Sequence, residues 1–177
     1  MALKKYIKNK LRLLMYHLNW ISADWEDKSL ILQAKIIMSS SVWRFADEKL
    51  DLSSKEFRVY SQSGDDGIIQ YLIHTLNIEN KKFIEFGVGN YFESNTHFLL
   101  INNNWSGFVI DGSEKCIDII KNAPFFWRYD LNLKAAFINK DNINNLLEYS
   151  NFSDIGLLHI DLDGNDYWIL NSIDMDK

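Results

Sequence analysis

Phe83-Ile84-Glu85-Phe86-Gly87-Val88-Gly89-Asn90 is the stretch of sequence that decides the fold of this chain. An apolar run ends in an acid and is followed by two glycines one residue apart. Parallel strands with helices on both faces are apolar throughout, so the run predicts a buried parallel strand. Gly87 and Gly89 suit a tight turn in which the backbone takes unusual φ values or comes close to a ligand. The stretch therefore predicts a strand and a turn beneath a nucleotide-like ligand, with unpaired N–H groups at the start of the next helix.

The residues after the turn argue against a dinucleotide site. A dinucleotide fingerprint continues to a third glycine, and Phe92 occupies that position here. A nucleotide-dependent oxidoreductase is therefore disfavoured. An acid followed by Gly-x-Gly, as in Glu85-Phe86-Gly87-Val88-Gly89, looks more like the first motif of class I S-adenosylmethionine-dependent methyltransferases.

The composition indicates a globular protein whose charge is unevenly spread. The chain has 177 residues, of which 47% are hydrophobic and 14% aromatic, enough for one domain with a proper core. The formal net charge of -5 argues against a general nucleic-acid-binding protein. Residues 1–20 carry five cations and no acids, so the remainder carries -10 (-5 minus +5). With one cysteine and neither a transmembrane run nor a signal peptide in view, we expect a cytoplasmic protein.

Residues 1–57 are expected to form an N-terminal helical extension. Apolar side chains recur at helical spacing in its first part, at Leu3, Ile7, Leu11, Leu14 and Leu18. They predict a basic amphipathic helix over 3–19. Residues 1–20 would then either pack on the domain or make an external contact, with anionic lipid at the inner membrane surface or with a partner. We favour packing, because most amphipathic helices bury their apolar stripe. A second helix is predicted from Ser22 to about Met38, and residues 42–45 suit either a short strand or a helical turn.

Residues 58–177 alternate between strands and helices, which predicts a Rossmann-like α/β domain with a parallel sheet and right-handed crossovers. The polar turn 60–67 leads into the first helix. The strands are expected at 82–86, 107–110, 136–138 and 155–160, each followed by a turn and a helix.

Polar residues follow each predicted strand, at the edge where ligands bind in open α/β sheets. Asp111, after the second strand, can accept hydrogen bonds from both hydroxyls of a ribose, because an ionised carboxylate only accepts. Asp141 and Asn142, after the third, could accept from the exocyclic amine of a purine. Three acids follow the fourth strand, beside the expected reactive end of the ligand: Asp161, Asp163 and Asp166.

In order and spacing, these motifs are similar to those of FkbM-type methyltransferases from bacterial surface-polysaccharide gene clusters. The similarity covers about residues 58–175 and rests on four blocks: Ser61-Gln62-Ser63-Gly64-Asp65-Asp66-Gly67, Phe83-Ile84-Glu85-Phe86-Gly87-Val88-Gly89, Gly107-Phe108-Val109-Ile110-Asp111-Gly112-Ser113 and His159-Ile160-Asp161-Leu162-Asp163-Gly164-Asn165-Asp166. The resemblance implies S-adenosylmethionine as methyl donor, and a sugar or glycan-linked oxygen as acceptor in polysaccharide biosynthesis.

The resemblance also assigns residues to parts of the donor. It implies that Glu85, Gly87 and Gly89 line the methionine and ribose, and that Asp111, with Gly112, holds the ribose hydroxyls. The adenine would lie by two further residues, Asp141 and Asn142. The methionine end would be closed over by Ser61 and Gln62.

The expected reaction is in-line attack of a substrate hydroxyl on the methyl sulfonium, with Asp161 or Asp163 as general base. Alternatively, these acids with Asp166 hold Mg²⁺, which acidifies the hydroxyl. We place the general base first and assign no metal ligand, because Asp-x-Asp is also a common turn sequence.

One departure from the family pattern is serious. Class I methyltransferases have seven strands, whereas only four are predicted here. The missing part would complete the sheet and much of the acceptor pocket, and the open edge of the fourth strand would favour association. We therefore expect either a truncated form or a sheet completed by a partner, such as a second copy of the chain. The rival function is a non-catalytic donor-binding or interaction module left by C-terminal truncation.

Overall fold

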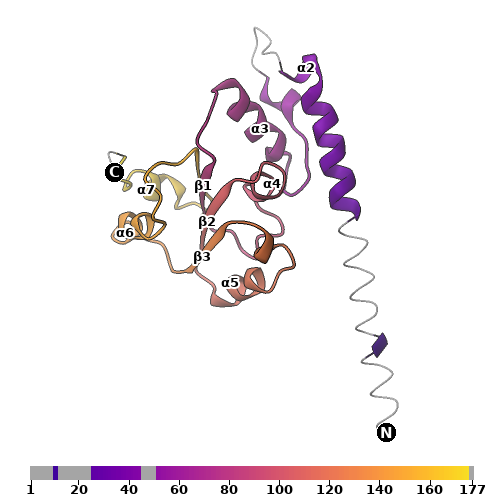
Figure 1. Ribbon diagram of the computed structural model, residues 1–177. Helices are drawn as coiled ribbons and strands as arrows, with labels where there is room; N and C mark the ends of the chain where they lie inside the picture. Colours follow the sequence, from indigo (N-terminus) through magenta and orange to yellow (C-terminus); the bar gives the residue numbers. More distant parts are fainter. Residues whose placement is uncertain (1–9, 12–24, 45–50, 176–177) are drawn as a thin grey trace. The chain divides into compact units, whose positions relative to one another are not determined.

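A computed structural model describes residues 10–11, 25–44 and 51–175 (Figure 1). The chain divides into two compact units, Met1–Phe45 and Ala46–Lys177, so the division falls before the predicted boundary at 57 and 58. The reason is that residues 51–57, which were predicted to belong to the extension, pack within the second unit. The N–H of Gly67 donates to the carbonyl of Phe57 at 3.1 Å. A Cβ at Gly67 would lie 2.2 Å from the carbonyl oxygen of Lys55, so this close packing requires glycine.

The first unit is helical where it is described. Residues 25–39 form one helix, and after a bend the chain makes the short helix α2 (Ser41–Arg44). Of the two alternatives for residues 42–45, the described part is therefore a helical turn. The start predicted at Ser22, and most of the helix predicted over 3–19, lie outside the described residues.

The second unit contains a four-stranded, all-parallel sheet in the order β3-β2-β1-β4. The strands are β1 (Lys82–Phe86), β2 (Ser106–Asp111), β3 (Leu131–Ala135) and β4 (Leu157–Ile160). Because the first strand lies inside the sheet, the chain builds outward in one direction as far as β3 and then returns to add β4 on the other side. This confirms an α/β domain with a parallel sheet, compatible with a Rossmann-like fold.

The helices lie on both faces of this sheet (Figure 1). Their bounds are α3 Asp65–Thr75, α4 His97–Ile101, α5 Glu114–Lys121, α6 Ile143–Glu148 and α7 Asp166–Leu170, with 3-10 turns η1 Leu52–Lys55 and η2 Phe126–Arg128. Figure 1 shows α3, α4 and α5 on one side of the strands and α6 and α7 on the other.

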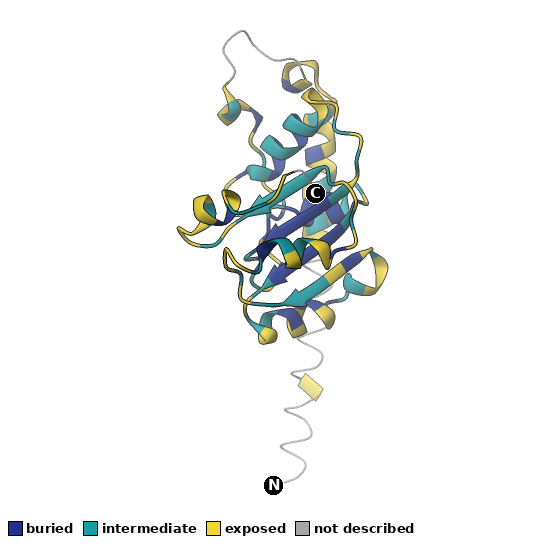
Figure 2. Ribbon diagram, turned by 90° about the vertical axis from the view of Figure 1, so that its left-hand side faces the viewer, coloured by how far each residue is buried: buried dark blue, intermediate teal, exposed yellow. Residues whose placement is uncertain are grey.

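Two apolar clusters fill the spaces between the sheet and its helices. Along β1, Phe83 belongs to one cluster and Ile84 and Phe86 to the other, as the alternation of side chains along a strand requires. The inner strands β1 and β2 are almost fully buried, whereas β4 is half-buried along its whole length (Figure 2). The predictions of β1 and β2 are confirmed within one residue at each end.

The third strand was predicted in the wrong place. It covers Leu131–Ala135, not 136–138. This edge strand alternates apolar and polar residues, as in Leu131-Asn132-Leu133-Lys134, because only part of its surface is covered. The apolar run Ala136-Phe137-Ile138 belongs instead to the loop after it.

Candidate functional site

A cleft lies at the carboxyl ends of the strands, beside the point where the strand order reverses between β1 and β4. Ligands bind at this point in open parallel sheets. The cleft consists of two adjoining hollows of about 350 and 390 Å³. Both are lined by Gly87, Gly89 and Asp161. We call the two hollows together the strand-end cleft.

The two glycines after β1 serve different purposes. Gly87 has a φ of +78°, and a Cβ there would lie 1.7 Å from the carbonyl oxygen of Asp161. Its close contact is therefore with the exit of β4, within the protein. Gly89 has a φ of +54°, and no atom lies within 4 Å of where its Cβ would be. The open space beside Gly89 is available to a ligand.

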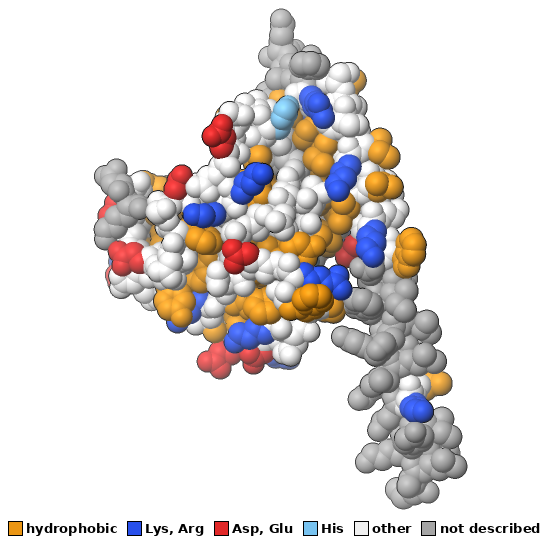
Figure 3. All heavy atoms as spheres, in the orientation of Figure 1, with side chains coloured by type: hydrophobic (Ala, Val, Ile, Leu, Met, Phe, Trp, Pro, Cys, Tyr) orange, Lys and Arg blue, Asp and Glu red, His pale blue; other side chains and the backbone are white. Residues whose placement is uncertain are grey.

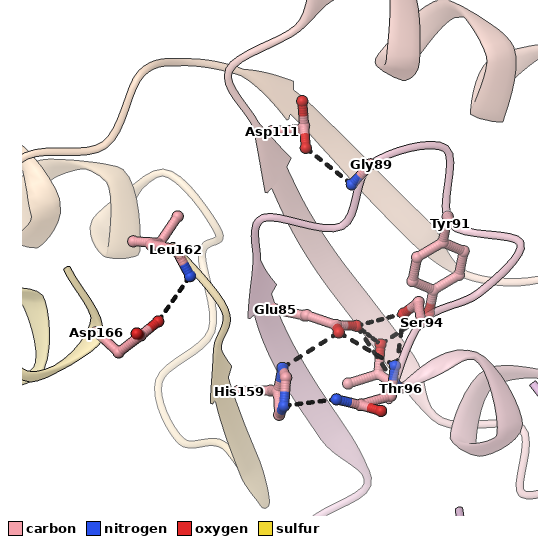
Figure 4. Close-up of polar contacts among 10 residues, drawn as sticks. Glu85, Gly89, Tyr91, Ser94, Thr96, Asp111, His159, Leu162 and Asp166 are labelled. Atoms are coloured by element: carbon pink, nitrogen blue, oxygen red, sulfur yellow. Dashed lines mark hydrogen bonds and ion pairs between the residues drawn. The ribbon is translucent and has the colours of Figure 1, made fainter. Parts of the chain in front are cut away.

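Asp111 stands at the end of β2 with its carboxylate fixed by backbone groups. Its Oδ2 accepts a hydrogen bond from the N–H of Gly89 at 2.8 Å (Figure 4). Its Oδ1 accepts from the N–H of Ser113 at 2.8 Å. A carboxylate oxygen can accept more than one hydrogen bond, so each retains capacity for a donor in the cleft. Asp111 and the neighbouring Gly112 both line the second hollow.

Glu85 is the centre of a buried polar network on the floor of the first hollow (Figure 4). Its carboxylate, 3% exposed, accepts from the Ser94 hydroxyl at 2.6 Å, the N–H of Asn95 at 3.2 Å, and both the N–H and hydroxyl of Thr96. Burial raises the pKa of Glu85, but His159 and these hydrogen bonds outweigh burial and lower the pKa below its usual value. Glu85 therefore organises the loop at 94–96 and offers little to a ligand directly.

His159 on β4 pairs in register with Glu85 on β1. Its Nδ1 lies 3.2 Å from Glu85 Oε1, an ion-pair distance without the alignment of a hydrogen bond, and its Nε2 lies 2.8 Å from Asn95 Nδ2. Burial lowers the pKa of His159, but the Glu85 carboxylate outweighs burial and raises it above the usual value. His159 and Asn95 carried no predicted role. The only signal in the sequence was that His159 precedes Asp161 by two residues.

In the polar turn before α3, some side chains line the cleft and others bind the backbone of the turn. Ser61 is fully buried, and its hydroxyl accepts from the N–H of Asp66 at 3.0 Å. In return, Asp66 Oδ2 accepts from the N–H groups of Val59, Tyr60 and Ser61. Burial raises the pKa of Asp66 despite these hydrogen bonds. Gln62 lines the first hollow, whereas Ser61 does not line it and binds the backbone of the first turn of α3 instead.

The residues predicted beside adenine do not line the cleft. The side chain of Asn142 accepts from the N–H of Asn139 and donates to the carbonyl of Phe137, so it holds its own loop. Asp141 is exposed outside both hollows. Because β3 ends at Ala135, the residues that reach the second hollow are the three that follow it, including Phe137, which is 81% exposed.

The three acids after β4 fall into two groups. Asp161 lines both hollows and Asp163 only the second, and both are exposed. Asp166 instead accepts from the N–H of Leu162 at 2.6 Å and of Gly164 at 3.2 Å, and these hydrogen bonds lower its pKa. Asp166 therefore shapes the loop. Within residues 10–11, 25–44 and 51–175, no three His, Cys, Asp or Glu side chains gather in a way that could hold a metal ion.

A buried histidine lies on the edge of this region. His97, at the start of α4, stacks against the rings of Tyr60 and Tyr91, with centroids 4.1 and 4.8 Å away. Burial lowers the pKa of His97 to about 4. His97 is therefore neutral at neutral pH and belongs to the aromatic packing.

The charge of the strand-end cleft is the property that most restricts its ligand. Among the described residues, its lining contains no lysine or arginine, and it contains six carboxylates: Asp65, Glu85, Glu93, Asp111, Asp161 and Asp163. Two of these are offset: Glu93 pairs with Arg58 at 3.0 Å, and Glu85 lies against His159. The remaining acids disfavour a ligand that carries phosphates and favour one that carries positive charge.

No protein-family model, curated protein or solved structure matches this chain. In the part of the chain that the structure describes, no helix has the length and apolar character needed to cross a membrane.

Proposed function

We propose that this chain binds S-adenosylmethionine in the strand-end cleft and transfers its methyl group to a hydroxyl of a sugar or surface-glycan precursor. The observation that carries the proposal is that, within the described part of the chain, the cleft is lined by carboxylates and by no lysine or arginine. A dinucleotide would bring a pyrophosphate into this lining, whereas the proposed donor brings a sulfonium and an ammonium group. The FkbM-type motif order supports the same donor and supplies the class of acceptor.

Asp111 is the proposed ribose ligand. Its carboxylate is held in place by Gly89 and Ser113, so accepting from two ribose hydroxyls needs no rearrangement of the side chain. The space beside Gly89 leaves room for the sugar to approach the backbone. Phe137, exposed in the second hollow, replaces Asp141 and Asn142 as the proposed neighbour of the adenine.

Asp161 is the proposed general base, because it lines both hollows and its carboxylate is exposed. The acceptor hydroxyl would give its proton to Asp161 as its oxygen forms the new bond to the methyl carbon. The bond from carbon to sulfur breaks, and its electron pair remains on a neutral thioether. Alignment of hydroxyl and methyl group would supply much of the rate. A carboxylate lining also binds the cationic donor in preference to its neutral product, which assists product release.

The donor assignment is tested by isothermal titration of the full chain with S-adenosylmethionine, S-adenosylhomocysteine and NAD. We expect binding of the first two and not of NAD. Asp111→Ala should weaken donor binding by about 1.5–3 kcal/mol, the contribution of hydrogen bonds to a charged group. Asp118→Ala is the matched control, since Asp118 is an exposed acid on α5 outside the cleft. Binding of NAD alone would overturn the proposal.

The chemical step is tested by transfer of a labelled methyl group to glycan acceptors. Asp161→Asn should lower turnover on the order of a hundredfold to ten-thousandfold while leaving donor affinity unchanged. Asp163→Asn tests the alternative base. Loss of turnover with a chelator, restored by Mg²⁺, would change the role of Asp161 from base to metal ligand. Donor binding with no transfer to any acceptor would instead favour the non-catalytic module.

A further inference from the structure

The helix of residues 25–39 carries its most exposed apolar side chains along one side, and Leu30 and Ile37 on the other side are 38% and 40% exposed. Trp25, Leu32 and Ile36 are 70%, 63% and 64% exposed. Their spacings of seven and four residues place them on one face of a helix. We call these three residues the outer stripe. The opposite face carries Ala34, which is buried, so the outer stripe lies on the side of the helix away from Ala34.

Two lysines border the outer stripe. Lys28 and Lys35, both exposed, each follow a stripe residue by three positions and therefore lie along the same flank of the helix. Figure 3 shows exposed hydrophobic side chains along this helix with basic side chains beside them. The helix itself has two acids as well, Glu26 and Asp27, so its own charge is balanced.

The positive charge that selects a partner comes from the residues just before the helix. Residues 1–20 carry five cations and no acids, whereas the remainder of the chain carries -10. An apolar stripe with a tryptophan at one end, lysines on its flank and a cationic segment next to it is the combination that binds anionic bilayer surfaces. A second protein surface would not require the tryptophan or the strongly one-sided charge.

We infer that the outer stripe is a membrane contact that lies in the headgroup region of an anionic bilayer, with Lys28 and Lys35 directed at the lipid phosphates. Helix 25–39 would lie on the bilayer surface, since no described helix is long and apolar enough to cross it. This inference is independent of the proposed methyl transfer.

The test is flotation of the full chain with vesicles of phosphatidylcholine alone and of phosphatidylcholine mixed with phosphatidylglycerol. We expect binding only to the mixed vesicles, with a partition coefficient that falls as salt is added. The double variant Leu32→Gln/Ile36→Gln should lower that coefficient on the order of tenfold to a hundredfold, because two apolar side chains lose their burial in the bilayer. Leu76→Gln is the matched control, a leucine 66% exposed at the end of α3, and should bind as the wild type does.

A second variant separates lipid contact from folding. Lys35→Glu leaves the outer stripe intact and should reduce binding to mixed vesicles, with an unchanged circular dichroism spectrum. If the double variant Leu32→Gln/Ile36→Gln binds the mixed vesicles as strongly as the wild type does, the contact belongs to residues 1–20 alone and the inference is overturned. The inference is also overturned if the wild type does not bind vesicles, sediments as a dimer, and becomes monomeric in the double variant. That result would assign the outer stripe to contact with a second copy of the chain. Failure of the wild type to bind mixed vesicles would also overturn it.

Discussion

Replacing Glu85 by Gln tests whether the buried network on the floor of the cleft is a determinant of stability. The substitution keeps the shape of the side chain and removes its charge. In the folded protein Oε2 accepts from the Ser94 hydroxyl and from the N–H and hydroxyl of Thr96. Oε1 accepts from the N–H of Asn95 and lies against His159. A glutamine can place its single carbonyl oxygen at only one of these positions, so its amide NH₂ must face donors at the other.

The expected loss follows from this count. With the carbonyl at the Oε2 position, the N–H of Asn95 loses its acceptor and His159 loses the carboxylate oxygen that lies 3.2 Å from its Nδ1. An unsatisfied buried N–H costs about 1–3 kcal/mol, and breaking a buried ion pair from one side costs about 3–5 kcal/mol. A neutral His159 leaves no uncompensated charge, which reduces that second cost. We therefore expect Glu85→Gln to lower the free energy of unfolding by about 3 kcal/mol at pH 7.

Urea unfolding followed by far-ultraviolet circular dichroism measures this loss, with Glu93→Gln as the control. Glu93 also lines the first hollow and pairs with Arg58, but both side chains are about half exposed, so its loss should cost less than about 1 kcal/mol. Because the pKa of Glu85 is lowered in the folded state, its carboxylate stabilises the fold above the ordinary value of 4.5. The gap between wild type and Glu85→Gln should narrow as the pH falls below that value. Equal losses for the two variants at pH 7 would refute the reasoning.

Three further predictions concern the glycine turn, the buried histidine and the last loop. Gly89→Ala should cost on the order of 1–2 kcal/mol for its positive φ, and Gly87→Ala more, because its Cβ would also collide with the Asp161 carbonyl; both are measured by urea unfolding. The pKa of His97 falls from 6.5 to about 4 on folding, so only the unfolded state gains a proton as the pH falls through that window. Wild type should lose up to about 3 kcal/mol of stability between these pH values, and His97→Phe should remove that loss. Asp166→Ala should cost about 1 kcal/mol in thermal unfolding, because the loop after β4 loses two hydrogen bonds to its N–H groups.

Each of these has an outcome that would contradict it. Equal costs at Gly87 and Gly89 would mean that the turn does not touch the exit of β4. If His97→Phe loses as much stability as the wild type between these pH values, the His97 ring titrates normally in the folded state. Asp163→Asn is the control for the last loop, since Asp163 accepts none of these hydrogen bonds, and a cost equal to that of Asp166→Ala would contradict the assignment.

The inner strands could be predicted from the sequence because complete burial leaves a continuous apolar run. Two such runs are Phe83-Ile84 and Phe108-Val109-Ile110, and an acid directly follows each of them. An edge strand is only partly covered, so its residues alternate between apolar and polar. At 131–135 this alternation was a weaker signal for a strand than the apolar run in the loop that follows. The error at β3 also displaced the predicted adenine neighbours, since it moved the expected strand end toward Asp141.

The sequence indicated which residues line the cleft where a residue's place at the end of a strand decides this. It did not do so where a hydrogen-bond partner elsewhere in the fold decides it. Asp111 lines the cleft because it ends an inner strand. Ser61 and Asn142 are also polar and near strand or helix ends, but their side chains bind their own backbone, which a sequence pattern does not distinguish from facing a ligand. His159 was missed because its partners, Glu85 and Asn95, become its neighbours only through the pairing of β1 with β4.

The contact between Gly87 and the carbonyl of Asp161 has a consequence for how the cleft forms during folding. The turn and the exit of β4 meet without a side chain between them, and His159 reaches Asn95 across 64 residues of sequence. Such long-range contacts close late, because the loop-closure entropy must be overcome before they contribute. The cleft therefore does not exist in an intermediate that has formed only β1, β2 and β3. Any ligand that binds there must slow the detachment of β4 more than that of the other strands, and amide hydrogen exchange in 157–160 will be the most sensitive reporter of occupancy.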